Sequence, residues 1–328
     1  MTKVRSDRVI FADLLRGVSI LYIVGFWHLM TYTKVCPIYY NQLTVRTTVV
    51  VLGLFVFLSG YFLGKKNLSK NDSIKAFYVK RFLRIYPLYF VALLLFLLSN
   101  LIDTSTWLKG CLTISMFDGP VPPTVWFISM LLVFYLVAPL FILDAKKNIL
   151  RYLFLTAAIW GAIAFLVFIL PSSDPRILIY FPSFILGIYW ANHDIPEGGR
   201  LCWIATALVL LSFVLSVALK NDPEQSLLST PLACFAPLAI FILFKRGSNR
   251  LPNSPVIYEL SYAGFVMFLI HKPLYTVMIE TYFPVTSGHQ FMYLLFFCLP
   301  LIVALSWLTQ RSYDNLLKKL RSAIATAG

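Results

Sequence analysis

Residues 9–31 read VIFADLLRGVSILYIVGFWHLMT, and this stretch decides the fold class. It is almost entirely apolar, and a helix that crosses the hydrocarbon core of a bilayer needs about 20 such residues. The stretch nevertheless carries three ionisable side chains, Asp13, Arg16 and His28. Because it holds charged residues and no small-residue cleavage site follows it, we expect it to remain in the protein as a membrane helix rather than to be removed as a signal peptide.

Nine further apolar runs follow the first one. The composition agrees with them, since 59% of the 328 residues are apolar and 13% are charged, against about 45–50% and about 25% in soluble domains. This balance argues against a soluble enzyme, a disordered chain and a nucleic-acid-binding protein. We predict an all-α, polytopic integral membrane protein with about ten transmembrane helices in one bundle, a single domain over residues 1–328 with no soluble domain. The predicted spans are 9–31, 43–63, 84–103, 124–143, 150–170, 176–193, 200–219, 228–245, 256–280 and 290–310.

Lysine and arginine are distributed unevenly over the segments that connect these spans. If the N-terminus is cytoplasmic, 21 of the 28 basic residues lie on the cytoplasmic side and 5 on the opposite side, while Arg16 and Lys272 lie within spans. Cytoplasmic segments are the ones enriched in these residues. We therefore predict that both termini are cytoplasmic, and the formal charge of +14 indicates topology rather than a nucleic-acid partner.

Ionisable side chains inside membrane spans are costly and mark functional sites by default. Asp13 and Arg16 are three residues apart, so they share a helix face on which an ion pair can form. His28 follows Arg16 by twelve residues, and His271 lies in the ninth predicted span, two residues before Pro273. Each also has a structural interpretation: an interfacial anchor for the Asp13–Arg16 pair, an interfacial side chain for His28 and a hydrogen-bonded core residue for His271.

Two further arginines mark the entry into the third predicted span. Arg81 and Arg84 are three residues apart on the predicted cytoplasmic side. The planar guanidinium group suits phosphate recognition because it forms two parallel hydrogen bonds. The pair therefore favours an anionic phosphate ligand, and the alternative is an anchor of the positive-inside pattern that contacts lipid phosphates.

Several common active-site patterns are missing. The sequence has no GxSxG, HExxH or GxxxxGK[ST] motif, and neither His28 nor His271 begins an HxxxxD pattern. The five cysteines show no CxxC and no Cys/His pair at zinc-ligand spacing, so we expect no metal; a disulfide between Cys36 and Cys111 stays open. These absences argue against a serine hydrolase, a metalloprotease and a nucleotide-driven pump.

Six stretches, taken in order, resemble membrane acyltransferase family 3, the multi-helix bacterial acyltransferases that modify cell-surface glycans. Together they extend over nearly the whole chain. The matching stretches are FADLLRGVSILYIVGFWH at 11–28, LFVFLSGYFLGKK at 54–66, YVKRFLRIYPLYF at 78–90, VWFISMLLVFYLVAPL at 125–140, PSFILGIY at 182–189 and ELSYAGFVMFLIHKPL at 259–274.

The resemblance implies an acyl-CoA-dependent O-acyltransferase of a bacterial inner membrane. The expected donor is acetyl-CoA or a related acyl-CoA, and the acceptor is a hydroxyl group of a glycan or lipid-linked saccharide, activated by a histidine general base. The expected partners are the lipid bilayer, these two substrates and glycan-assembly proteins, without nucleic acid. The candidate site residues are His28, Arg16 and His271 for catalysis, Arg81 and Arg84 for donor binding, and Trp126 and Asp13 for substrate binding.

Two features depart from the family pattern. The family usually places ten residues between the basic residue and the histidine of the first helix, whereas eleven separate Arg16 from His28. On a regular helix, twelve steps of about 100° leave these side chains about 120° apart. We therefore predict that the helix bends or widens near Gly25 and turns His28 toward His271. The stretch WFIS at 126–129 is not followed by the glutamate that many members carry, so we place no acid–base group there.

Two other functions are compatible with the same residues. A transporter or flippase for an acyl or glycan intermediate would use the buried charges as a path without thioester chemistry. A non-catalytic membrane subunit is the second alternative. The identity of the acceptor and of the acyl group stays open, as does the choice between direct transfer and an acyl-enzyme intermediate.

Overall fold

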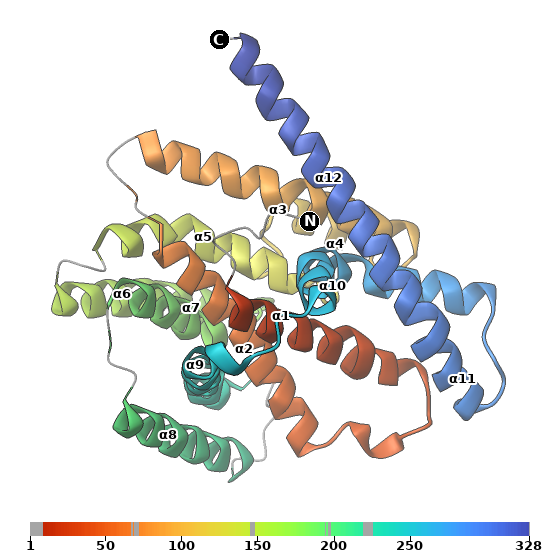
Figure 1. The fold of residues 1–328 in the computed structure, drawn as a ribbon, viewed down its shortest axis with the longest axis horizontal. Coiled ribbons are helices and arrows are strands. Elements are labelled where there is room, and N and C mark those ends of the chain that lie inside the picture. The colour runs from red at the N-terminus through yellow and green to blue at the C-terminus, as the bar shows by residue number, and fades with distance from the viewer. Residues whose placement is uncertain are drawn as a thin grey trace. The chain divides into compact units, whose positions relative to one another are not determined.

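The computed structural model describes residues 9–66, 68, 72–144, 148–193, 195, 198–218 and 226–327, and in these ranges the regular structure is helical, without a strand (Figure 1). Nine helices of this part of the chain are long and apolar enough to cross a membrane. The remaining predicted span, 176–193, forms helix α7 (Arg176–Asn192) of 17 residues, slightly short of the usual length of about 20. The prediction of an all-α, multi-pass membrane protein is confirmed.

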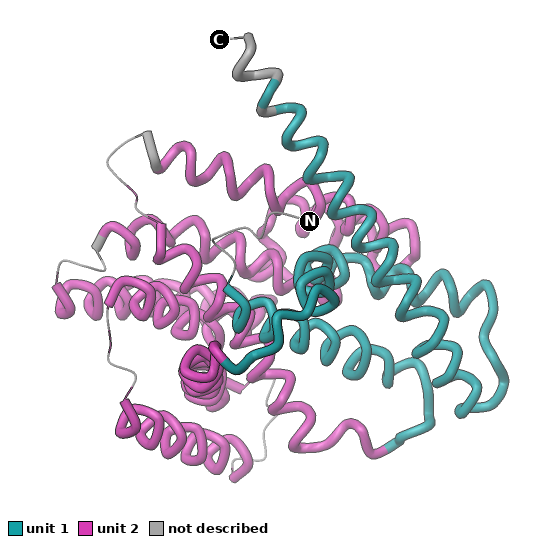
Figure 2. Tube along the Cα trace, in the orientation of Figure 1, with its two compact units in different colours: residues 1–37, 250–328 teal, residues 38–249 magenta. Residues whose placement is uncertain are grey.

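The chain divides into two compact units (Figure 2): unit 1 comprises residues 1–37 and 250–328, and unit 2 comprises residues 38–249. Unit 1 contains α1 (Ile10–Tyr22), η1 (Ile23–His28), η2 (Leu29–Tyr32), α10 (Pro255–Thr281), α11 (Ser287–Tyr293), η6 (Leu294–Cys298) and α12 (Leu299–Ala327). Unit 2 contains α2 (Gln42–Gly64), α3 (Asp72–Leu98), α4 (Thr104–Cys111), α5 (Trp126–Asp144), α6 (Ile149–Ile169), α7, α8 (Gly199–Ala218), η4 (Leu227–Ser229) and α9 (Thr230–Arg246). Short 3₁₀ turns, η3 (Pro37–Tyr39) and η5 (Ser248–Arg250), lie at the boundaries. The prediction of a single domain stays a prediction.

Unit 2 is built on the close packing of α2 against α7. Small residues at a helix contact let two backbones approach each other, which is how helices pack in lipid. A Cβ atom at Gly60 would overlap the carbonyl oxygen of Phe184, and one at Gly187 would overlap the carbonyl oxygen of Phe57. The hydroxyl group of Ser183 also donates to a backbone carbonyl of α2 at 3.1 Å. These positions therefore accept only glycine unless the helices separate.

A buried arginine joins α8 to α2. Arg46 is 1% exposed, and its Nε donates to the hydroxyl group of Ser216 at 3.0 Å while Nη1 donates to the carbonyl oxygen of Gln42 at 2.9 Å. Two more bonds reach the Ser216 carbonyl and the Gln42 side chain. A buried charge is costly unless its hydrogen bonds are made, so these neutral partners account for the position of the guanidinium group.

Helix α3 begins earlier than predicted. We expected the third span at 84–103, but the helix extends over Asp72–Leu98, so Arg81 and Arg84 lie within it rather than at its start. Basic residues lower the hydropathy of the segment without opposing helix formation, since lysine and arginine are good helix formers. The last helix likewise continues past the predicted end at 310.

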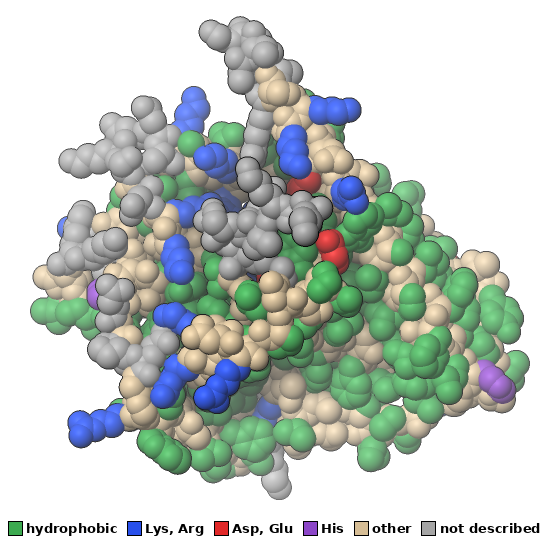
Figure 3. Space-filling model, in the orientation of Figure 1, with side chains coloured by type: hydrophobic (Ala, Val, Ile, Leu, Met, Phe, Trp, Pro, Cys, Tyr) green, Lys and Arg blue, Asp and Glu red, His purple; other side chains and the backbone are tan. Residues whose placement is uncertain are grey.

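Apolar side chains cover much of the surface, including the face drawn in Figure 3. Helices α6 and α8 expose many large apolar side chains. Among them, Phe154 is 76%, Phe168 76% and Trp203 78% accessible. Exposed apolar surface of this extent is unusual for a water-soluble monomer and is what lipid-facing helices require.

The substitution Gly60→Ala is expected to lower the free energy of unfolding by about 1–3 kcal/mol, the usual cost of overpacking a core contact. The thermal unfolding midpoint of the protein in lipid nanodiscs measures this loss. Gly161→Ala in α6 is the matched control, because a Cβ atom there meets nothing within 4 Å, and it should leave the midpoint unchanged or slightly higher. An unchanged midpoint for Gly60→Ala would contradict the close α2–α7 contact.

Candidate active site

The first span is not a regular α-helix near its end. Helix α1 passes into the π-helix η1, which contains Gly25 and ends at His28, and then into the 3₁₀ turn η2. A π turn holds an additional residue, and such turns are frequent at functional sites. The predicted widening near Gly25 is confirmed, and it offsets the additional residue between Arg16 and His28.

The widened turn places His28 against His271 of α10. The Nδ1 atom of His28 lies 2.8 Å from Nε2 of His271, and the rings stack with their centroids 4.8 Å apart. His271 is completely buried, whereas His28 is half-buried. Both belong to unit 1, and the predicted turn of His28 toward His271 is confirmed.

The surroundings of His271 define the direction of the hydrogen bond between the two rings. Nδ1 of His271 lies 3.0 Å from the carbonyl oxygen of Met267 and 2.9 Å from that of Phe268. Carbonyl oxygens only accept, so this nitrogen carries a proton, and Nε2 of the neutral ring holds a lone pair. His28 therefore donates from Nδ1, and the lone pair of its own ring lies on Nε2. A neutral pair is the arrangement that burial favours, because a charge is costly to bury.

Side chains from α10 and α12 surround the π turn. The hydroxyl group of Tyr275 donates to the carbonyl oxygen of Val24 at 3.3 Å, which provides a partner for a backbone group within the turn. Gly25 lies against α12, where a Cβ atom would come within 3.0 Å of a methyl carbon of Leu299. Tyr275 was not among the predicted site residues, although its position four residues after His271 places it on the same helix face.

Asp13 and Arg16 lie near the N-terminal end of the first span. Asp13 Oδ1 accepts a hydrogen bond from the hydroxyl group of Ser261 on α10 at 3.2 Å. His28 follows Arg16 by twelve positions, which corresponds to about 18 Å of helix rise. The structure therefore brings His28 and His271 together and does not bring Arg16 to them.

Arg81 lies in unit 2, half-buried beside two aromatic rings. Its guanidinium carbon is 5.9 Å from the ring centroid of Phe77 and 5.9 Å from that of Tyr135. Its Nε atom is buried and has no hydrogen-bond partner among the described residues. A buried donor without a partner requires an explanation, and an anionic ligand is a suitable one. Arg84, one turn further along α3, is exposed.

A lysine that sequence reasoning did not select adds to this positive charge. Lys66 follows the end of α2, and its pKa is lowered to about 8 by loss of contact with water and by the positive charges of Arg81, Arg84 and Lys80. These four residues are called the basic cluster below. Lys66 belongs to the run of lysines after the second span, but only the tertiary structure places it near α3.

Trp126 begins α5 in a packed environment. It is 7% exposed, and the guanidinium carbon of Arg176 lies 3.7 Å from its ring centroid. Arg176 is ion-paired with Asp174, and a cation over an indole face is a stabilising contact. One face of Trp126 is therefore covered by protein.

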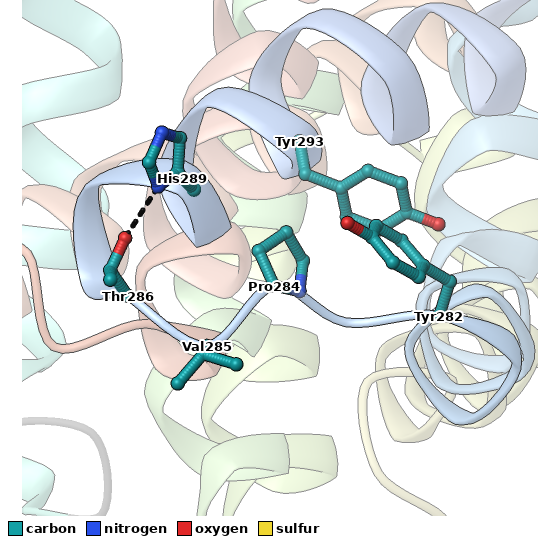
Figure 4. A pocket seen from close by; sticks show the side chains of 6 residues that line it. All are labelled: Tyr282, Pro284, Val285, Thr286, His289 and Tyr293. Carbon is teal, nitrogen blue, oxygen red and sulfur yellow. Dashed lines mark hydrogen bonds between the residues drawn. The ribbon is translucent and has the colours of Figure 1, made fainter.

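A separate pocket of about 490 Å³ lies between α10 and α11 (Figure 4). None of the predicted site residues lines it. His289 Nδ1 lies 2.6 Å from the Thr286 hydroxyl group there. Within the described ranges, no group of three or more His, Cys, Asp or Glu side chains could hold a metal ion.

The substitution Tyr275→Phe is expected to destabilise the protein by about 1–3 kcal/mol, because it leaves the Val24 carbonyl without its side-chain partner in a buried turn. The thermal unfolding midpoint in nanodiscs measures this effect. Tyr282→Phe, at a tyrosine that is 62% exposed, is the matched control and should leave the midpoint unchanged. Equal midpoints for the two variants would exclude a stabilising role of the Tyr275 hydroxyl group in the turn.

The chain was also compared with known protein families, curated proteins and solved structures. A family model described as an acyltransferase domain matches residues 9–311. Searches of curated proteins and of solved structures gave no match. The matched range contains both histidines and the basic cluster, and it extends from the first span into α12. This multi-pass membrane protein belongs to membrane acyltransferase family 3.

Proposed function

We propose that the protein is an O-acyltransferase of a bacterial inner membrane, with both termini cytoplasmic. It moves an acyl group, expected to be acetyl, from cytoplasmic acyl-CoA to a hydroxyl group of a cell-surface or lipid-linked glycan. The observation that carries the proposal is the hydrogen bond between His28 and His271, because its direction makes Nε2 of His28 a proton acceptor. Membership of the family supports the reaction class.

His28 acts as the general base of this reaction. Its Nε2 removes the proton of the acceptor hydroxyl group while the hydroxyl oxygen bonds to the thioester carbonyl carbon. The tetrahedral intermediate then collapses, the carbon–sulfur bond breaks, and the imidazolium proton of His28 passes to the departing thiolate. His271 holds the ring in position and keeps the required nitrogen unprotonated, as the third member of a catalytic triad does.

The basic cluster binds the phosphate groups of the donor. Coenzyme A carries a diphosphate and a phosphomonoester, and guanidinium groups form charge-assisted hydrogen bonds with both. The unpartnered Nε atom of Arg81 supports this assignment. The roles of Arg16 in catalysis, and of Asp13 and Trp126 in substrate binding, stay predictions.

Replacement of His28 by alanine is expected to reduce acyl transfer by about 10²–10⁴-fold, the usual contribution of a general base. The assay is release of the CoA thiol from labelled acetyl-CoA by full-length protein in nanodiscs, with octyl glucoside and a lipid-linked saccharide extract as acceptors. His271→Ala should lower the rate less, because the base remains while its orientation is lost.

His289→Ala is the control for these variants, since it removes an imidazole of unit 1 outside the pair. It should retain the wild-type rate. A His28→Ala protein that unfolds at the wild-type midpoint and keeps the wild-type rate would exclude the general base. With the same protein in closed proteoliposomes, label that crosses the membrane without thiol release would instead support the transporter.

Donor affinity is expected to decrease as pH rises through about 8. The ammonium of Lys66 is charged below its pKa of about 8, so it attracts the donor phosphates at pH 7 and no longer does so at pH 9. Calorimetric titration of acetyl-CoA at several pH values measures this. Lys66→Met should bind more weakly at pH 7 and should show less dependence on pH.

Lys65→Met provides the matched control, because the neighbouring ammonium lies over the Tyr61 ring, 4.7 Å from its centroid. This variant should keep the wild-type decrease. If Lys66→Met and Lys65→Met bind acetyl-CoA equally at every pH, Lys66 does not belong to the donor site.

A further inference from the structure

The proposed reaction places a negative charge on the thioester oxygen when the hydroxyl oxygen adds to the carbonyl carbon. Such charge is usually stabilised by a hydrogen-bond donor or a cation that is already in position. Two hydroxyl groups near the histidine pair already donate elsewhere. Tyr275 donates to the Val24 carbonyl, and Thr31 donates to the His28 carbonyl at 2.6 Å.

Lys272 is a cation at this place that the proposed reaction does not yet use. It follows His271 directly on α10 and is half-buried within the span. Its charge interacts with the rings of both His28 and His271. In the part of the chain that the structure describes, its ammonium has neither a hydrogen-bond partner nor a carboxylate partner.

An ammonium without a counter-charge is costly inside a membrane span, and ionisable residues there usually pair or serve a function. Arg46 shows the usual structural solution, since several hydrogen bonds to its neighbours satisfy its guanidinium group. Lys272 lacks such partners, although it directly follows His271, which is hydrogen-bonded to the proposed base. A negative charge that exists only during the reaction would provide the missing partner.

We propose that Lys272 stabilises the oxyanion that forms on the thioester carbonyl during acyl transfer. The inference rests on the proposed function of the histidine pair. The ammonium keeps its three protons throughout: the oxygen gains its charge when the new carbon–oxygen bond forms and loses it when the carbon–sulfur bond breaks. His28 alone carries the transferred proton.

The experiment measures kcat and both KM values for Lys272→Met and Lys272→Arg, using full-length protein in phosphatidylcholine nanodiscs, labelled acetyl-CoA and the neutral acceptor octyl glucoside. Loss of an oxyanion donor is expected to lower kcat of Lys272→Met by about 10²–10³-fold while both KM values change little. Lys272→Arg retains a positive charge and should regain at least about tenfold of that loss. Glu280→Gln, an exposed charge change on the same helix, is the matched control and should keep the wild-type kcat.

The possible outcomes separate this inference from the proposed function. A wild-type kcat in Lys272→Met, with His28→Ala inactive, overturns the role of Lys272 and leaves the general base intact; Lys272 is then a membrane anchor. A loss confined to the KM of an acceptor also overturns it, because the lysine then binds ground-state substrate. A wild-type protein that releases no CoA thiol with any acceptor overturns the proposed function and this inference with it. Thermal unfolding midpoints show that each variant is folded.

Discussion

Inside a bilayer no water bonds to the peptide groups, so each backbone N–H and C=O needs a partner within the protein. This constraint explains why the described spans are helices, and it gives the irregular turn η1 its importance. The Val24 carbonyl within that turn accepts a hydrogen bond from Tyr275 on another helix. A widened turn can therefore persist in lipid, and it is this turn that directs His28 toward His271. The candidate catalytic pair thus depends on how the backbone of the first span is satisfied.

The buried cations of the protein differ in how they are compensated. Arg46 makes its hydrogen bonds to neighbouring residues of unit 2, which is sufficient for a structural role. Arg81 has a buried Nε atom without a partner among the described residues, and Lys272, the residue after His271, has no counter-charge in the same ranges. Since an uncompensated charge in a membrane is costly, the last two positions are better explained by a ligand than by stability.

The histidine pair also favours an enzyme over a transport path. In a transporter, ionisable groups along the path exchange partners as the path opens and closes. Nδ1 of His271 lies against two backbone carbonyl groups of its own helix, which hold the ring and its tautomer in one state. A fixed ring that orients a second imidazole is the arrangement a general base requires.

The sequence alone determined the membrane class and the approximate positions of the spans, because these depend on hydropathy along one segment. The widened turn at Gly25 was predicted by setting the count of residues between Arg16 and His28 against the pattern of the family it resembles. The predicted start of the third span was wrong, since hydropathy does not detect a helix that begins before its apolar part. Only the tertiary structure showed the hydrogen bond that makes Nε2 of His28 the acceptor, the contact of Tyr275 with the turn, and Lys66 near Arg81. These contacts join residues far apart in the chain, and whether such residues meet is decided by the packing of helices against one another.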